Sequence, residues 1–132
     1  LLEAFPGVVA GTKDSEGDPA RVERVCREYP QLTVFAGSEG ILLDTLRWGG
    51  DGCISATVNV TARESREVYD LWAAGRSEEA SQAQRALTAR RDALERPPLI
   101  PRLKALVHEA TGEDVWRNLR PPLEPLQVSS TP

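Results

Sequence analysis

The sequence predicts an α/β fold in which parallel strands alternate with helices. In residues 1–75, three short runs of strand-forming residues are each followed by a run with helical spacing. No strand pattern follows Gly75. A free sheet of three strands would leave two unpaired edges, and a complete (β/α)8 barrel needs roughly 250 residues. The 132 residues therefore match about the last three β/α units of a TIM barrel (1–75), followed by a C-terminal helical extension and irregular tail (76–132).

The first unit begins with residues 8–11, which are apolar and flanked by glycine, as in a strand buried on both faces. Asp18 and Pro19 then favour a helix start, because Asp caps free backbone N–H groups and proline fits the first helical turn. Apolar residues recur at helical spacing from this point, and Pro30 ends the predicted helix.

The second and third units follow the same order. Residues 32–36 are rich in strand formers, and residues 41–48 place apolar side chains on one helical face before two glycines. Residues 53–57 are the third predicted strand. Thr61 followed by Glu64 predicts a capping box, which opens the helix of the third unit.

The extension is predicted to be helical. Residues 77–94 form one long helical stretch, and residues 97–101 are predicted to be a rigid proline linker. Residues 103–110 carry apolar side chains at helical spacing and predict a last helix. The proline-rich residues 120–132 should be irregular.

Composition excludes several classes of protein. The formal net charge is -4, with 16 basic and 20 acidic residues, and no basic stripe could follow a phosphate backbone, so no nucleic acid is expected as a partner. No apolar run approaches the roughly 20 residues that cross a bilayer, so no membrane association is expected and a cytoplasmic location is favoured. Cys26 and Cys53 show neither metal-ligand nor disulfide spacing, and we expect both to be core thiols.

Lys13 is the candidate catalytic residue. It follows the first predicted strand, and in barrels the carboxyl ends of the strands form the catalytic face. A lysine that is partly removed from water there has more of the neutral, nucleophilic amine. Taken alone, the same position also suits a solvated surface lysine.

Four segments, in order and spacing, resemble the dihydrodipicolinate synthase and N-acetylneuraminate lyase family: GTKDSEGD (11–18), FAGSEGILL (35–43), GGDGCISATVNV (49–60) and RPPLEPL (120–126). The resemblance spans nearly the whole chain. It implies a (β/α)8 barrel with a helical extension, in which the three strands here would be the sixth, seventh and eighth.

The resemblance also implies a chemistry. The lysine of the first segment, here Lys13, would condense with the ketone of pyruvate or of another 2-keto acid, and the protonated imine would allow a carbon–carbon bond to an aldehyde to form or break. No metal and no organic cofactor is implied. Relatives in this family are usually dimers or tetramers, so a homo-oligomer is expected.

Further site residues follow from the second and third segments. Gly37, Ser38 and Glu39 match a turn that contacts the distal substrate hydroxyls in some relatives, although Glu39 also fits a helix start that favours an acidic residue. Ile54 and Ser55 match the last strand, whose backbone lies beside the imine in relatives, and the alternative for them is plain barrel core.

Other readings stay open. The family's proton-relay tyrosine and its Thr-rich carboxylate loop belong to earlier strands, and both Tyr29 and Tyr69 fall on predicted helices. Synthases of this family commonly carry Asn-Pro-Ile-Pro-Val-Lys where residues 98–104 read PLIPRLK. This difference leaves room for a 2-keto-3-deoxy sugar acid aldolase or dehydratase. A catalytically inactive barrel that binds a keto acid, or an inactive fragment, is a further alternative.

Overall fold

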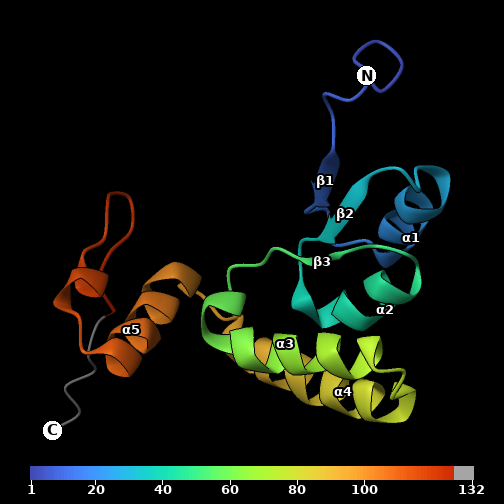
Figure 1. The fold of residues 1–132 in the computed structure, drawn as a ribbon. Helices are drawn as coiled ribbons and strands as arrows, with labels where there is room; N and C mark the ends of the chain where they lie inside the picture. Colours follow the sequence, from blue (N-terminus) through green and yellow to red (C-terminus); the bar gives the residue numbers. More distant parts are fainter. Residues whose placement is uncertain (127–132) are drawn as a thin grey trace, which may run out of the picture.

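The computed structural model describes residues 1–126 and has a three-stranded sheet followed by helices (Figure 1). The elements in chain order are β1 (Gly11–Asp14), α1 (Pro19–Glu28), β2 (Thr33–Ala36), the 3-10 turn η1 (Glu39–Ile41), α2 (Leu42–Arg47), β3 (Gly52–Cys53), α3 (Val58–Ala73), α4 (Ser77–Leu94), α5 (Leu99–Thr111) and the 3-10 turn η2 (Asp114–Arg117). The predicted α/β class is confirmed. The end of the predicted irregular tail, residues 127–132, lies outside the described residues.

The three strands are parallel and lie in the order β1, β2, β3. Lys13 of β1 is the register partner of Phe35 in β2, and Phe35 is in turn opposite Gly52 of β3. Helices α1 and α2 make the crossovers between successive strands, as parallel pairing requires. Because all strands run the same way, their carboxyl ends meet at one edge of the sheet.

Helices cover one face of this sheet. Val34 and Ala36 of β2 are fully buried, and Val34 packs with Val22 and Cys26 of α1. Side chains alternate along a strand, so Phe35 points to the opposite face. Phe35 is only half-buried, because no helix of the described chain covers that side.

A second core joins the sheet layer to the extension. Helices α3 and α4 lie side by side, and α2 packs against both (Figure 1). The turn between α3 and α4 needs the left-handed backbone of Gly75, whose φ is 73°. The buried apolar residues of this core are Leu42, Leu43, Leu46, Val68, Ala80 and Leu87.

Two predicted strands have different bounds in the structure. The first is Gly11–Asp14 and not residues 8–11; Val8 is 74% exposed. The β2 ladder begins at Thr33 opposite Gly11, and the carbonyl of Ala10 accepts a hydrogen bond from the N–H of Thr33 at 3.0 Å, so Val8 and Val9 lie before the start of the ladder. The third strand is Gly52–Cys53 and not 53–57, because β2 ends at Ala36 and leaves later residues nothing to pair with.

Helix starts are confirmed in two cases and wrong in two. Asp18 caps α1 through its side chain, which accepts a hydrogen bond from the backbone N–H of Ala20 at 3.0 Å, and α4 has the predicted bounds. Thr61 forms no capping box, since α3 already begins at Val58 and Thr61 lies at a kink inside it. The predicted linker 97–101 is also wrong at its end, because α5 begins at Leu99.

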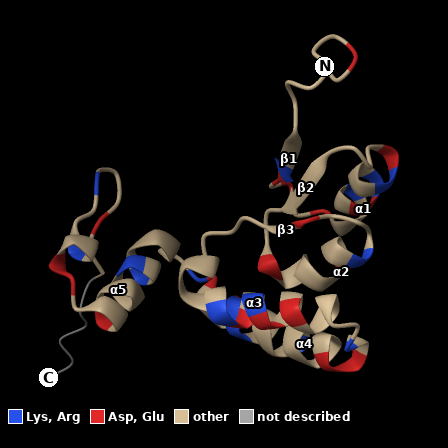
Figure 2. Ribbon diagram, in the orientation of Figure 1, with Lys and Arg blue, Asp and Glu red and all other residues tan. Residues whose placement is uncertain are grey.

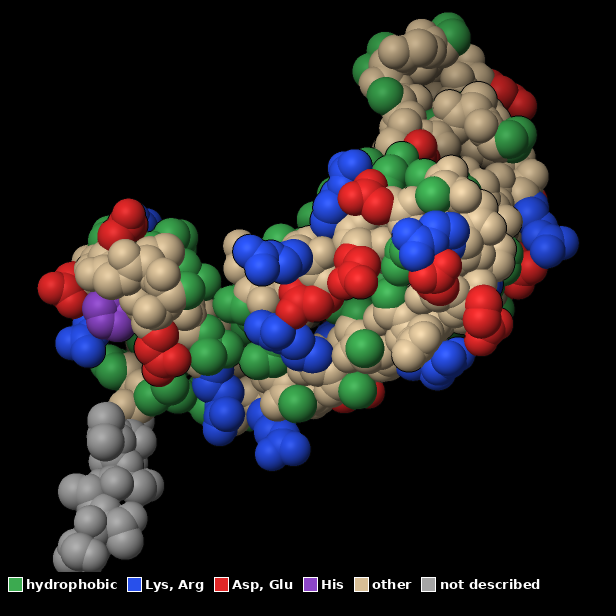
Figure 3. All heavy atoms as spheres, turned by 60° about the horizontal axis from the view of Figure 1, so that its bottom comes forward, with side chains coloured by type: hydrophobic (Ala, Val, Ile, Leu, Met, Phe, Trp, Pro, Cys, Tyr) green, Lys and Arg blue, Asp and Glu red, His purple; other side chains and the backbone are tan. Residues whose placement is uncertain are grey.

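Charged side chains of both signs are interspersed over the helices (Figure 2). The face shown in Figure 3 likewise mixes Lys and Arg with Asp and Glu. Several charged side chains of the helices pair locally, such as Arg66 with Asp70 and Arg76 with Glu79. Within residues 1–126, no helix is both long enough and apolar enough to cross a bilayer.

Leu87→Ala is expected to destabilise the protein more than any other single truncation in the second core. Leu87 is 1% exposed and among the largest fully buried side chains, so its removal would leave a cavity costing about 2–5 kcal/mol of unfolding free energy. Urea unfolding would measure this loss. Leu94→Ala, at the half-buried end of the same helix, is the control and should cost clearly less; equal losses would contradict the packing described here.

Candidate functional site

Three turns meet at the carboxyl edge of the sheet. β1 ends at Asp14, β2 continues into residues 37–41, and β3 continues into Ile54 and Ser55. The ladder still joins the last two, since the backbone N–H of Ile54 donates to the carbonyl of Ala36 at 2.9 Å. The sheet therefore brings the sequence-predicted residues from all three segments to one edge.

Lys13 lies within β1, one residue before its end. Strand alternation places its side chain on the same face as its register partner Phe35, which is the face that α1 and α2 leave uncovered. The side chain is exposed in this chain. The next residue, Asp14, points to the helix side and is 6% exposed.

Asp14 fixes the end of β1. Its carboxylate accepts a hydrogen bond from the guanidinium of Arg21 on α1 at 2.6 Å and another from the backbone N–H of Glu16 at 3.0 Å. The first is charge-assisted and ties the strand end to the following helix. Asp14 is thus a polar residue at the strand end that holds the backbone next to Lys13 in place.

Gly37 allows the turn after β2 to approach β1 closely. A Cβ on this residue would lie 2.5 Å from the carbonyl oxygen of Asp14 and 2.9 Å from Cα of Ser15, both backbone atoms. The next residue, Ser38, caps η1, and its hydroxyl accepts from the N–H of Gly40 at 3.0 Å. Glycine is therefore required for the contact between the two strand ends.

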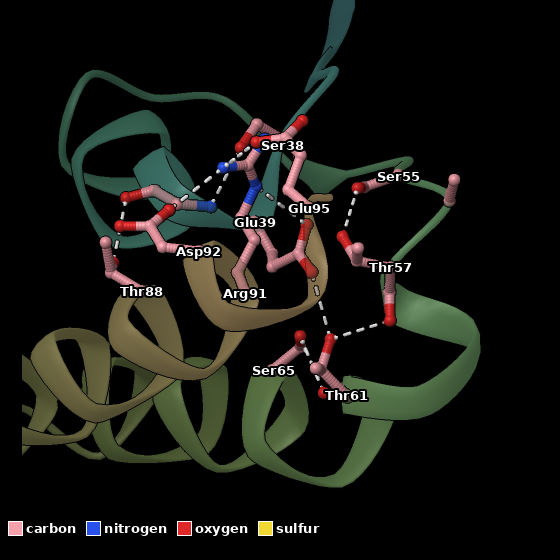
Figure 4. Close-up of polar contacts among 12 residues, drawn as sticks. Ser38, Glu39, Ser55, Thr57, Thr61, Ser65, Thr88, Arg91, Asp92 and Glu95 are labelled. Carbon is pink, nitrogen blue, oxygen red and sulfur yellow. Dashed lines mark hydrogen bonds and ion pairs between the residues drawn. The ribbon is translucent and has the colours of Figure 1, made fainter. Parts of the chain in front are cut away.

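Glu39 is fully buried, with 0% of its surface exposed. Its Oε1 accepts a hydrogen bond from the hydroxyl of Thr61 at 3.0 Å, and its Oε2 lies 3.7 Å from Nε of Arg91 (Figure 4). The sequence suggested either contact with substrate or a helix start favourable to an acidic residue. The residue does begin η1, but its carboxylate points into a polar cluster inside the protein and not to the surface.

The surroundings of Glu39 keep it ionised. Burial alone raises its pKa, but the hydroxyls of Ser55, Thr57 and Thr61 and the local backbone outweigh burial, and the pKa is lowered. Only Thr61 bonds directly to the carboxylate, whereas the hydroxyls of Ser55 and Thr57 are 3.0 Å from each other and act as nearby dipoles.

The segment directly after β3 supplies the remaining predicted residues. Ile54 is 50% exposed, and Ser55 is half-buried next to Thr57. Cys53 packs against the second core, where burial and then the charge of Glu39 raise the pKa of its thiol to about 11. Both cysteines are free thiols, and Cys26 is buried.

Glu39→Gln is expected to cost about 1–3 kcal/mol of unfolding free energy near neutral pH, because a buried, hydrogen-bonded carboxylate is lost. The folded-state pKa lies below the ordinary value of 4.5. The carboxylate therefore adds stability above that pH, and this contribution disappears as the pH falls through the lowered pKa. Denaturant unfolding over an acid pH series should show the parent approaching the variant on acidification. Glu67→Gln, on an exposed position of α3, serves as the control; a pH-independent gap at Glu39 would contradict the account.

Sequence reasoning missed the residues of α4 that contact the turn after β2, which are Gln84, Thr88 and Arg91. They lie more than forty positions from the turn in sequence, as in the Gln84–Leu43 hydrogen bond with a separation of 41. Their spacing of four and three places them on one helical face, which was the available signal.

The chain has a parallel sheet with helices on one face, and a lysine and polar turns lie at the carboxyl edge of that sheet. This arrangement is typical of α/β proteins whose functional sites lie at the strand ends. A model of the Dihydrodipicolinate synthetase family matches residues 1–132. A 4-hydroxy-tetrahydrodipicolinate synthase of Gluconacetobacter diazotrophicus is 36% identical over 89 residues, 65% of this chain and 30% of the relative. An N-acetylneuraminate lyase of Histophilus somni is 36% identical over 83 residues, 63% of this chain and 28% of the relative.

A solved structure agrees with these matches. A prophage protein of the dihydrodipicolinic acid synthase family from E. coli K12, in complex with pyruvate, has a TM-score of 0.73 and 28% identity over 89% of this chain and 41% of its own. The chain belongs to the dihydrodipicolinate synthetase family. It spans about 30% of the curated relatives' length.

Proposed function

We propose that the protein is a Schiff-base-forming, pyruvate-dependent lyase or synthase in which Lys13 supplies the imine nitrogen. The observation that carries this proposal is the position of Lys13, on the uncovered face of β1 at the carboxyl edge of a parallel sheet. Membership in the family and the pyruvate complex of a structural neighbour support it.

The proposal includes a closed barrel. The strands β1, β2 and β3 would be the last three of eight, and the face that carries Lys13 and Phe35 would be the barrel interior. Further strands would then pair with the free edges of the sheet and remove Lys13 from water. Loss of water around the amine favours its neutral form, which is the nucleophile.

The chemistry follows from an amine at that place. The neutral amine of Lys13 adds to the ketone carbon of a 2-keto acid, and loss of water gives a protonated imine. The imine accepts the electron pair when a proton leaves the neighbouring carbon, and the product is an enamine. The enamine can attack an aldehyde to form a carbon–carbon bond, and the reverse sequence breaks one. These steps require no metal and no organic cofactor.

The other candidate residues would surround the substrate, with Gly37, Ser38 and Glu39 near its distal hydroxyls and Ile54 and Ser55 beside the imine. Gly37 and Ser38 line the turn beside β1, and the exposed Ile54 and half-buried Ser55 lie beyond β3. Glu39, which is buried, would act on the substrate through the hydroxyls near it. The sequence PLIPRLK at residues 98–104 departs from the stretch common in synthases and leaves room for an alternative substrate, a 2-keto-3-deoxy sugar acid, whose own ketone would form the imine with Lys13.

Exchange of the methyl hydrogens of pyruvate in deuterated water tests the proposal without knowledge of the aldehyde. Enamine formation removes a proton, and its reversal adds a deuteron, so proton NMR should show loss of the methyl signal with the full-length protein. Tight pyruvate binding in calorimetry without any exchange would instead support an inactive keto-acid-binding protein. We also propose a cytoplasmic location and a dimer or tetramer, and light scattering tests the latter.

A further inference from the structure

Helix α4 presents three polar side chains to the turn after β2, here called the β2–α2 turn (37–41). Gln84, Thr88 and Arg91 recur at spacings of four and three and so share one face of the helix. Figure 4 shows Arg91 beside Ser38 and Glu39. We call these three residues of α4 the polar stripe.

Gln84 binds the backbone of the turn through its amide nitrogen and the start of α2 through its amide oxygen. Its Nε2 donates to the carbonyls of Glu39 at 2.9 Å and Gly40 at 3.1 Å, and its Oε1 accepts from the N–H of Leu43 at 2.9 Å. Thr88 adds a longer hydrogen bond, 3.3 Å, to the carbonyl of Gly40. The stripe therefore satisfies backbone groups of the turn that the short helix α2 cannot bind.

Arg91 reaches the charged side of the same turn. Its Nε lies 3.7 Å from Oε2 of Glu39, and its Nη1 binds Glu95 at 2.7 Å. Its stem packs over Gly40, where an added Cβ would lie 3.5 Å from Cδ of Arg91. Neither Oε2 of Glu39 nor Nε of Arg91 has a hydrogen-bond partner among the described residues. The buried carboxylate thus has one nearby positive group, on α4, to offset its charge.

The turn is fixed on its other side by β1, where Gly37 lies against the backbone of Asp14. The two contacts place the turn between the strand that carries Lys13 and a helix of the C-terminal extension. A displacement of α4 would therefore move the Ser38–Glu39 segment relative to β1.

We infer that the polar stripe, and Arg91 in particular, positions the β2–α2 turn for the second substrate of the reaction. This inference rests on the proposed function, in which that turn lies near the distal hydroxyls of the substrate, the part that the second substrate contributes. Arg91 touches no reacting atom in this account and is a positioning residue. Imine formation at Lys13 should not depend on it, whereas the affinity for the second substrate should.

The test compares Arg91→Gln with Arg90→Gln in the full-length protein. Arg90 is the adjacent arginine of α4, but it points to α3 and binds Glu64 and the carbonyl of Val60. Hydrogen–deuterium exchange should speed up by roughly tenfold in the turn peptide of Arg91→Gln and stay unchanged in Arg90→Gln. Equal exchange in the turn peptide of the two variants would overturn the inference whatever the activity.

A kinetic readout separates positioning from general loss of structure. With 4-hydroxy-2-oxoglutarate or N-acetylneuraminate as probes, Arg91→Gln should raise KM by roughly tenfold and leave kcat within about twofold. Arg91→Lys, which keeps the charge, should recover part of the KM effect. A fall in kcat of Arg91→Gln for both probes, with KM unchanged, would overturn the inference. It would also be overturned if the parent protein exchanged the pyruvate methyl hydrogens but cleaved neither probe. If the parent protein showed no exchange of the pyruvate methyl hydrogens, the proposed function would be overturned. The amide hydrogen–deuterium exchange of the turn peptide would then test the positioning role of Arg91 by itself.

Discussion

Replacing Lys13 by arginine is expected to lower pyruvate exchange and any aldol turnover by at least about a thousandfold, because a guanidinium cannot form the imine. Arginine keeps the charge and the approximate length of the side chain. In the closed barrel proposed above Lys13 would face the interior, where a larger guanidinium must be accommodated, so the fold should survive the change with a loss of about 1–3 kcal/mol of unfolding free energy. NMR exchange and denaturant unfolding on the same samples would separate chemistry from stability.

The sequence offers a matched control, since Lys104 is its only other lysine. Lys104 lies on α5 and donates a hydrogen bond to the carbonyl of Asn118, far along the chain from the strand ends. Lys104→Arg should leave exchange unchanged. Full activity in Lys13→Arg, or its loss in Lys104→Arg, would remove Lys13 from the mechanism.

Gly37→Ala is expected both to destabilise the protein and to slow pyruvate exchange. The added Cβ would lie 2.5 Å from the carbonyl oxygen of Asp14, the last residue of β1, and 2.9 Å from Cα of Ser15, the residue after it. Both are backbone atoms, so neither can move without shifting the end of the strand. We expect a loss of about 1–3 kcal/mol of unfolding free energy and, because the strand end next to Lys13 must move, a fall in pyruvate exchange of roughly a hundredfold.

Gly49→Ala is the control for Gly37→Ala. Gly49 has a φ of 91° and no atom within 4 Å of an added Cβ, so alanine there should cost roughly 1 kcal/mol through backbone strain alone. Pyruvate exchange should be retained in this variant. If Gly37→Ala also retained both stability and exchange, the close contact between the two strand ends would not have the importance assigned to it.

The local signals of the sequence predicted the succession of elements well. Capping by Asp18 and the bounds of α4 depend on neighbouring residues, and both are as expected. Strand bounds depend on pairing with residues distant in sequence, which an apolar run does not reveal. The predicted strand at 8–11 is therefore wrong in its bounds, and β1 covers Gly11–Asp14. Thr61 was misread for the same reason, because its hydroxyl bonds to Glu39, 22 positions away, and does not cap a helix.

The candidate site shows the same division. Strand order and parallel direction brought Lys13, Gly37 and Ile54 to one edge, as the alternating pattern predicts. The burial of Glu39 could not be predicted, because it depends on the packing of α4 and its polar stripe, including Arg91, against the turn. By composition, α4 resembles a helix exposed to solvent. The predicted boundary at residue 75 stays a prediction, and the packing of α4 on the β2–α2 turn joins the two predicted parts closely.

Borohydride reduction in the presence of pyruvate tests the central claim most directly. The hydride would convert the imine into a stable secondary amine, and peptide mass spectrometry of the full-length protein would locate it. The account predicts a pyruvate-derived adduct on the peptide that contains Lys13 and none on the peptide that contains Lys104. An unmodified Lys13 after reduction, with pyruvate present in excess, would contradict it.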